Sequence, residues 1–86
     1  MQEYEILFAR SARKDLEKIS FQIANRILNK IEMLSKDPRP RGCEKLKGGE
    51  NLWRIRIGNY RVIYKIFDKE KLIDIFIIRH RSEAYR

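Results

Sequence analysis

The chain has 86 residues, 43% of them apolar and 37% charged, which is enough for one globular domain, residues 1–86, and too few for two. Its net charge of +8 indicates a partner that carries negative charge. No apolar run approaches the roughly 20 residues of a membrane span, and the N-terminus lacks the pattern of a secretion signal, so we expect a cytoplasmic protein that does not bind a membrane.

The first 42 residues have the pattern of one strand followed by two helices. Residues 2–8 alternate apolar and polar side chains, which predicts a half-buried strand. Ser11 and Ser20 are candidate N-caps of the two helices, and the prolines within residues 36–42 end the second one. Spacings of three and four give each helix an apolar face. These faces consist of Ala12, Leu16 and Ile19 in the first helix and of Ile23, Ile27, Ile31 and Leu34 in the second.

The remaining residues have the pattern of strands. A short segment at 44–47 precedes two glycines, and residues 53–64, WRIRIGNYRVIY, alternate on both sides of a Gly-Asn pair. This arrangement predicts a tight hairpin. Residues 72–78, LIDIFII, are apolar at nearly every position, so we expect a central strand that is buried on both faces.

This order of elements predicts an α+β fold, with a helical hairpin packed on a twisted, mostly antiparallel sheet of four to five strands. We expect the helices to cover the face that bears Trp53, Ile55, Ile57, Tyr60, Val62 and Tyr64. The opposite face would then present basic side chains, those of Arg54, Arg56, Arg61 and Lys65.

The turn at Gly58 and Asn59 places Arg56 directly opposite Arg61. Like charges in that position destabilise a sheet, so folding alone does not explain the pair. The net charge is also localised, since residues 38–65 contain eight Lys or Arg against two acidic residues. Such an excess is typical of a surface that binds phosphate groups, although a solubilising face is the alternative interpretation.

The C-terminal segment RHRSEAYR would bring Arg79, His80, Arg81 and Tyr85 to the same end of the sheet. These groups suit cleavage of RNA by its own 2′-hydroxyl, because arginine stabilises the charge on the phosphate. Arginine stays protonated, so His80 or Tyr85 would transfer the protons. Alternatively, His80 is a surface residue at a strand end, and Tyr85 packs on the sheet or stacks on an RNA base.

Cysteine and histidine are too scarce for a disulfide or a typical zinc site. Cys43 is the single cysteine and His80 the single histidine. We therefore expect a structural role for Cys43, and neither a metal nor another cofactor.

Two blocks, LKGG…LWRIRIGNYRVIY and HRSEAYR, follow the predicted strand and helices, and with them the sequence resembles the RelE/ParE superfamily of type II toxins over essentially its whole length. The resemblance implies a fold like that of small microbial ribonucleases. It further implies an endonuclease that cuts mRNA in the ribosomal A site without a metal, and a cognate RelB-like antitoxin that wraps the toxin.

Carried over by position, the resemblance gives Arg61 the role of stabilising the transition state and gives Tyr85 a role in catalysis or base stacking. Well-known RelE-like members have lysine, a possible base, at the positions of Arg54 and Arg56, where this chain has arginine. Many other members have a histidine at the position of His80, so the resemblance favours His80 as the acid or base here. The expected catalytic residues are Arg56, Arg61, Arg79, His80 and Tyr85. The residues expected to bind RNA are Arg54, Lys45, Lys47, Lys65 and Arg81.

Two other functions remain open. Branches of the superfamily that resemble ParE inhibit DNA gyrase and lack this catalytic set. A basic sheet face would also serve an RNA-binding module that does not cut. DNA breaks without truncated mRNA would indicate the first function, and RNA binding without a cut product the second.

Overall fold

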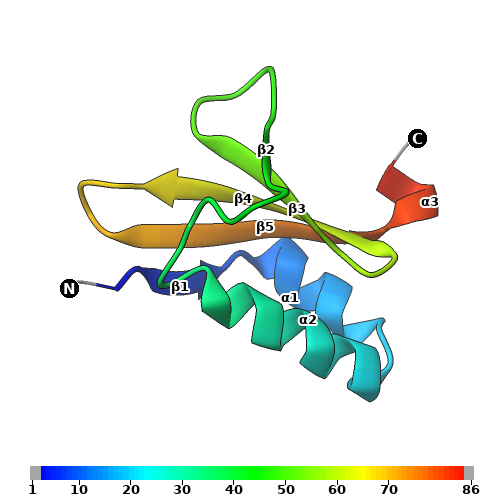
Figure 1. Ribbon diagram of the computed structural model, residues 1–86. Helices are drawn as coiled ribbons and strands as arrows, with labels where there is room; N and C mark the ends of the chain where they lie inside the picture. The colour runs from blue at the N-terminus through cyan, green and yellow to red at the C-terminus, as the bar shows by residue number, and fades with distance from the viewer. Residues whose placement is uncertain (1–2, 85–86) are drawn as a thin grey trace.

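In the computed structural model, which describes residues 3–84, two helices lie against one face of a five-stranded sheet (Figure 1). The elements in chain order are β1 (Glu5–Phe8), α1 (Arg10–Glu17), α2 (Phe21–Met33), β2 (Glu44–Lys45), β3 (Leu52–Ile57), β4 (Tyr60–Phe67), β5 (Leu72–His80) and α3 (Arg81–Ala84). The predicted α+β fold is confirmed, with a short α3 that the sequence analysis did not predict. No helix in this part of the chain is long and apolar enough to cross a bilayer.

The sheet has the strand order β1-β5-β4-β3-β2. β1 pairs with β5 in parallel, and all other neighbours are antiparallel, so the predicted mostly antiparallel sheet is confirmed. The strand in the middle is β4 rather than β5, which lies between β1 and β4. The register of β3 with β4 is the one that the Gly-Asn turn predicts.

The apolar run of β5 has a different cause from the one expected. The pairs Tyr64–Ile75 and Ile63–Ile77 follow one another in the register, so Phe76 is the extra residue of a β-bulge. The bulge shifts the alternation of β5 by one residue, and Phe76 and Ile77 are half-buried on the far side. The core residues of β5 are Ile73, Ile75 and Ile78. The prediction of a strand buried on both faces was therefore wrong. The run is apolar because the bulge moves the core-facing positions from Ile73 and Ile75 to Ile78.

The core lies between the two helices and the sheet. Ile27 and Ile31 of α2 and Leu34 just after it are at most 1% exposed, as the helical spacing predicted, whereas Ile23 is 39% exposed. Tyr64 of β4 is fully buried beneath them. Its hydroxyl group donates a hydrogen bond of 2.8 Å to the Pro38 carbonyl, which ties the loop after α2 to the sheet.

The two serines predicted as N-caps behave differently. α2 begins after Ser20, although the Ser20 side chain makes no capping hydrogen bond. α1 begins after Ala9, so Ser11 lies inside the helix and the predicted cap was wrong. The Ser11 hydroxyl group instead donates to the Phe76 carbonyl of β5 at 2.6 Å, because β5 continues past the end of β1 and its edge needs partners there.

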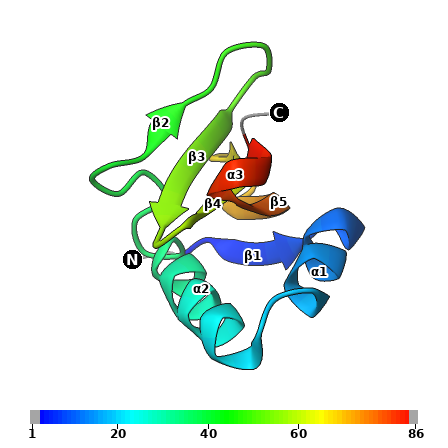
Figure 2. The ribbon, with the colours of Figure 1, turned by 90° about the vertical axis from the view of Figure 1, so that its right-hand side faces the viewer.

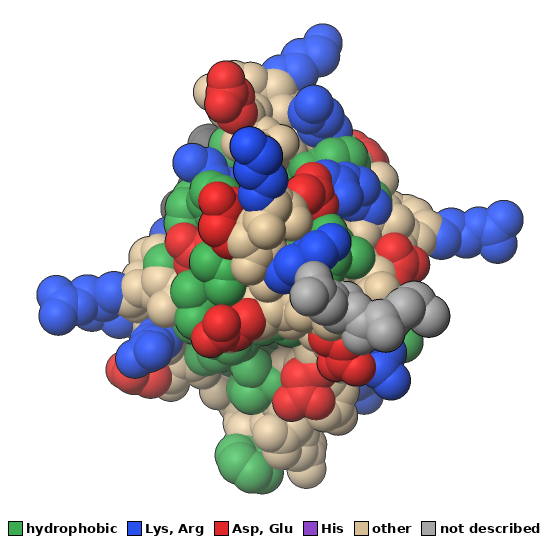
Figure 3. Space-filling view, turned by 90° about the vertical axis from the view of Figure 1, so that its left-hand side faces the viewer, with side chains coloured by type: hydrophobic (Ala, Val, Ile, Leu, Met, Phe, Trp, Pro, Cys, Tyr) green, Lys and Arg blue, Asp and Glu red, His purple; other side chains and the backbone are tan. Residues whose placement is uncertain are grey.

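A polar cluster joins the loop after α2 to the turn between β4 and β5. The Arg39 guanidinium lies 2.9 Å from Asp68 and 5.0 Å from the ring centroid of Trp53. Tyr4 also donates to Asp68, at 2.6 Å. The hydrogen bonds from Arg39 and then Tyr4 lower the pKa of Asp68 to about 2. Figure 3, which views this end of the molecule, shows acidic and basic side chains interspersed with hydrophobic ones.

We expect the Asp68 contacts to make stability depend on pH in acid. The pKa of Asp68 falls from 3.8 to about 2 on folding. Its contribution to the free energy of unfolding is therefore fully present above pH 3.8 and is lost as the pH falls through about 2. The side chains of Arg39 and Asp68 are 38% and 53% exposed, so solvent screening keeps the contribution below about 1 kcal/mol.

Thermal unfolding of the Asp68→Asn variant tests this pH dependence of stability. The variant is expected to melt a few degrees below the wild type at about pH 6 and together with it at about pH 2. A difference in melting temperature that stays the same across this range would contradict the assignment.

Candidate functional site

Three arginines on adjacent strands form a row across the sheet. The register places Arg56 of β3 opposite Arg61 of β4, and Arg61 opposite Arg79 of β5. Residues directly opposite one another share a face, and this face points away from α2, because Ile55 and Val62 of the same strands are buried on the other side. The predicted like-charge pair is confirmed, and a third arginine extends it. We call Arg56, Arg61 and Arg79 the arginine row.

The members of the arginine row differ in exposure. Arg61, in the middle, is 3% exposed, whereas the side chain of Arg79 is 44% exposed and Arg56 is open to solvent. In Figure 2, α3 lies in front of β4, on the face opposite α2. Burial holds the Arg61 guanidinium in one place, while its two neighbours can reach a ligand in solution.

The C-terminal segment is anchored to the hairpin turn. Gly58 has a φ of 58°, which glycine adopts at little cost and which this tight turn requires. The next carbonyl, that of Asn59, accepts a hydrogen bond of 2.7 Å from the Arg81 backbone N–H. α3 therefore begins beside the turn, and the exposed Arg81 lies at the same end of the sheet as the arginine row.

His80 lies on the other face of the sheet. It pairs with Tyr60, and the two rings meet edge-on with 5.2 Å between their centroids. The Ser82 backbone N–H donates to His80 Nδ1 at 3.3 Å, and Ser82 Oγ lies 3.0 Å from the same nitrogen. Because Nδ1 accepts a hydrogen bond, Nε2 carries the ring proton in the neutral form.

A cavity of about 260 Å³ connects His80 with Arg79 at the end of β5. Asp15 of α1 and the two residues Lys18 and Ile19 just after this helix line its wall. Asp15 Oδ1 lies 3.5 Å from Arg79 Nε. Asp15 is not among the site residues predicted from the sequence. The available signal was an acidic residue on the buried side of a short helix, three residues after Ala12.

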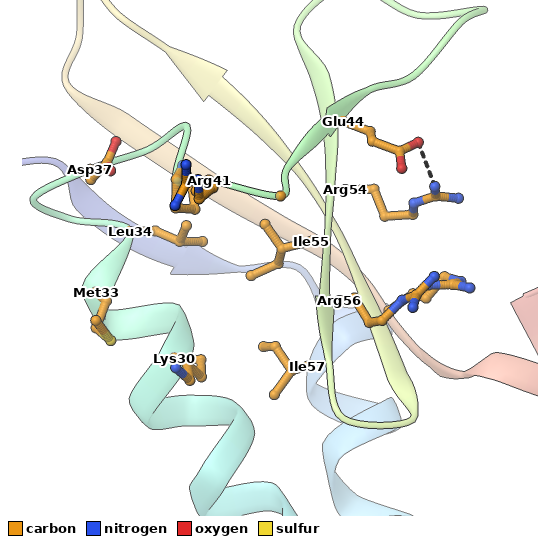
Figure 4. Close-up of a pocket in the computed structure, with 13 residues that line it drawn as sticks. Lys30, Met33, Leu34, Asp37, Arg41, Glu44, Arg54, Ile55, Arg56 and Ile57 are labelled. Carbon is orange, nitrogen blue, oxygen red and sulfur yellow. Dashed lines mark hydrogen bonds and ion pairs between the residues drawn. The ribbon is translucent and has the colours of Figure 1, made fainter.

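A larger hollow of about 450 Å³ lies along the edge of β3 (Figure 4). β2 pairs with the first half of β3, through Trp53 and Arg54, and within residues 3–84 no strand covers the second half. Ile55 and Ile57 point toward α2, whereas Arg54 and Arg56 point away from it. We call this hollow the edge groove. Its apolar wall consists of Met33, Leu34, Ile55 and Ile57, and its basic wall of Arg41, Arg54, Arg56 and Arg61.

A sequence profile of the family described as "ParE toxin of type II toxin-antitoxin system, parDE" matches residues 6–85. The chain belongs to this toxin family. Among curated relatives, the "Putative toxin RelE1" of Methanocaldococcus jannaschii is 32% identical over 76 residues, which cover 85% of this chain and 84% of the relative. "Toxin RelG" of Mycobacterium tuberculosis is 29% identical over 84 residues, or 96% and 97% of the two chains.

A solved structure agrees with these relatives. The archaeal RelE–RelB complex from Pyrococcus horikoshii contains a chain that matches with a TM-score of 0.82 and 31% identity, covering 95% of this chain and 99% of that one. The protein is therefore a RelE-like toxin of a type II toxin–antitoxin system.

One arginine of the toxin beside the arginine row already has a partner. Arg54 forms an ion pair of 2.6 Å with Glu44 across β2 and β3, and its side chain is 24% exposed. An RNA phosphate would have to replace the Glu44 carboxylate to bind Arg54.

The lysines that were expected to bind RNA lie away from the arginine row of the toxin. Lys65 shares its face but follows Arg61 by four residues, and its Nζ lies 5.4 Å from the ring centroid of Phe76. Lys45 pairs with Trp53 and so belongs to the face of Trp53. Lys47 lies in the loop before β3, away from the hairpin turn. Tyr85 falls outside the described residues.

Cys43 and the acidic residues of the toxin give no sign of a further centre. Cys43 is half-buried, and desolvation raises the pKa of its thiol, which favours the protonated and less reactive form. Within residues 3–84, no three His, Cys, Asp or Glu side chains are grouped so that they could hold a metal ion.

We expect the repulsion between Arg56 and Arg61 to lower the stability of the toxin. The exposed Arg56 can be replaced by threonine, which suits a strand and carries no charge. Arg56→Thr should raise the free energy of unfolding by roughly 0.5–1 kcal/mol in low salt, and the gain should shrink in high salt because ions screen the pair. Denaturant titration at two salt concentrations measures both effects.

Lys65→Thr is the matched control for this prediction. Lys65 lies on the same face, but the residue opposite it in the register is the acidic Asp74, so removing its charge should not stabilise the protein. An Arg56→Thr protein less stable than the wild type in low salt would show that the pair carries no penalty.

Proposed function

We propose that this toxin cleaves mRNA through attack of the RNA's own 2′-hydroxyl on the neighbouring phosphate, without a metal ion, and that the arginine row binds that phosphate. The observation that carries the proposal is the gathering of Arg56, Arg61 and Arg79 in one register across three strands, with the central guanidinium buried. Fixed cations stabilise the extra negative charge of the transition state more than the ground state, which is what accelerates the reaction.

The reaction also needs two proton transfers. A bond forms from the 2′-oxygen to phosphorus while the bond from phosphorus to the 5′-oxygen breaks. A base takes the proton of the 2′-hydroxyl, and an acid protonates the departing 5′-oxygen. The arginines keep their protons, so we assign these steps to His80 and Tyr85. His80 follows Arg79 directly and lines a cavity with it, which supports a place for its Nε2 near the same phosphate.

We further propose that the mRNA is cut in the ribosomal A site, as the RelE-like resemblance implies. The exposed Arg81 and the ion-paired Arg54 lie on either side of the arginine row and would bind flanking phosphates. Lys65 is farther along the same face and would bind a more distant phosphate. Lys45 and Lys47 lie elsewhere, so we assign them no contact with the scissile nucleotides.

Translation in vitro tests the proposal. Purified toxin is added to a translating mixture with a defined mRNA, and the cut ends are mapped by primer extension. Arg61→Lys keeps the charge but loses the bidentate fork, so cleavage should fall by roughly 10²–10³-fold. Tyr85→Ala should also remove most cleavage. Arg26→Lys, at an exposed site on α2, is the control and should cut like the wild type.

Undiminished cleavage by a folded Arg61→Lys protein would refute the role of the arginine row.

The description of the matched family as ParE toxin favours a second candidate function, inhibition of DNA gyrase. In that case expression would cause double-strand DNA breaks, and the mRNA in the translation assay would stay intact.

We also propose a RelB-like antitoxin as the partner, in line with the archaeal RelE–RelB complex. The edge groove suits a segment that carries both apolar and acidic side chains, because it has one apolar and one basic wall. Five cationic side chains line the groove against two acidic ones, Asp37 and Glu44. A bound acidic segment would neutralise the repulsion within the arginine row, and such segments are often disordered until they bind.

We expect the complex to be markedly more stable than the free toxin. An antitoxin at 100 times its dissociation constant adds about 2.7 kcal/mol to the free energy of unfolding, which is visible as a higher melting temperature. Met33, 62% exposed at the edge groove, provides a test, since Met33→Glu should weaken this effect. Phe21→Glu, at the other end of α2 and 79% exposed, should not. A melting temperature that does not change on adding antitoxin would contradict the proposal.

A further inference from the structure

α1 completes the edge of β5 where β1 stops. β1 ends at the pair Phe8–Ile75, and β5 continues to His80. Along this stretch the groups of α1 take over the hydrogen bonds that a neighbouring strand would make. Ser11 donates to the Phe76 carbonyl at 2.6 Å, and the Ile78 N–H donates to Asp15 Oδ2 at 3.0 Å.

The second carboxylate oxygen of Asp15 has another partner. Asp15 Oδ1 lies 3.5 Å from Arg79 Nε, and Asp15 is 9% exposed. Burying a carboxylate is costly unless its charge is matched. The Ile78 N–H requires an acceptor, but a neutral side chain such as asparagine would serve, so the negative charge is explained by Arg79 rather than by the backbone.

We infer that Asp15 is a positioning residue that holds Arg79 in the arginine row, an inference that rests on the proposed function. Asp15 engages Arg79 at Nε, and this leaves both terminal nitrogens of the guanidinium for a phosphate. Arg79 is 44% exposed and lies opposite Arg61, which has the same charge. Without the Asp15 carboxylate its long side chain turns toward solvent, and the phosphate loses one of its fixed cations.

A double-mutant cycle separates this role from a structural one. Asp15→Asn keeps an acceptor for the Ile78 N–H but removes the charge beside Arg79. In the wild-type background it should lower kcat for mRNA cleavage by roughly 10- to 100-fold, with a much smaller change in KM. In the Arg79→Ala background it should have no further effect. Equal losses in both backgrounds would overturn the inference.

The control lies on the same helix. Glu17→Gln removes one exposed carboxylate from α1 without touching the Asp15–Arg79 pair, so kcat should equal that of the wild type. A loss as large as that of Asp15→Asn would show that the general charge of α1 matters and would refute the specific pair.

A spectroscopic measurement keeps the inference testable apart from the proposed function. The ¹⁵N NMR signal of the Arg79 Nε–H should shift in Asp15→Asn and stay in place in Glu17→Gln, and an unchanged signal in Asp15→Asn would refute the pairing. If the wild type does not cut mRNA, the proposed function fails, while this signal still reports on the pair.

Arg79→Lys covers the case in which Asp15→Asn does not fold. Lysine has a single ammonium nitrogen in place of the three nitrogens of the guanidinium. If that ammonium pairs with Asp15, no further nitrogen is left to bind the phosphate. Its cleavage rate should match that of Arg79→Ala, and full activity would overturn the inference.

Discussion

The hydrogen-bonded ladders between β3, β4 and β5 hold three arginines directly opposite one another on one face of the sheet, despite their like charges. Each arginine alternates along its strand with residues of the core: Ile55 and Ile57 flank Arg56, and Val62 follows Arg61. Because successive side chains of a strand point to opposite faces, rotating or shifting the strand would move the core residues together with the arginines. The burial of these apolar side chains under α2 therefore fixes the positions of the charges, and the hydrophobic core and the basic face form a single arrangement.

The hairpin could be predicted in detail because its information is local. Two turn residues, Gly58 and Asn59, fix the register and with it the opposition of Arg56 and Arg61. The partner of Arg79 could not be derived in this way, since it depends on how β5 docks against β4 from a distant part of the sequence. For Asp15, the helical spacing shows a carboxylate on the buried side of α1, but it does not show that Arg79 lies within reach.

The arginines that would bind the phosphate and the histidine that would transfer a proton lie on opposite faces of the sheet. The arginine row faces away from α2, while His80 is on the side of Tyr60 and α1. They approach each other where β5 ends, at the cavity shared by Arg79 and His80. If His80 transfers a proton in the reaction, the ribose must lie at the rim of the sheet and not over its centre. The hydrogen bond from the Arg81 N–H to Asn59 places the start of α3 at that rim as well.

The bulge at Phe76 determines which of two neighbouring side chains joins the basic face. If the same residues formed a regular strand, the parity of Ile73 and Ile75 would continue to Arg79, which would then lie on the core face opposite Tyr60, and Ile78 would lie opposite Arg61. The bulge takes up Phe76 as an extra residue, and this returns Arg79 to the position opposite Arg61. A homologue that lacks the residue at the position of Phe76 would need no bulge and would still place its arginine opposite the counterpart of Arg61, because the pairs beyond the bulge stay the same. Alignments of such chains need a one-position gap inside the last strand before their site residues are compared.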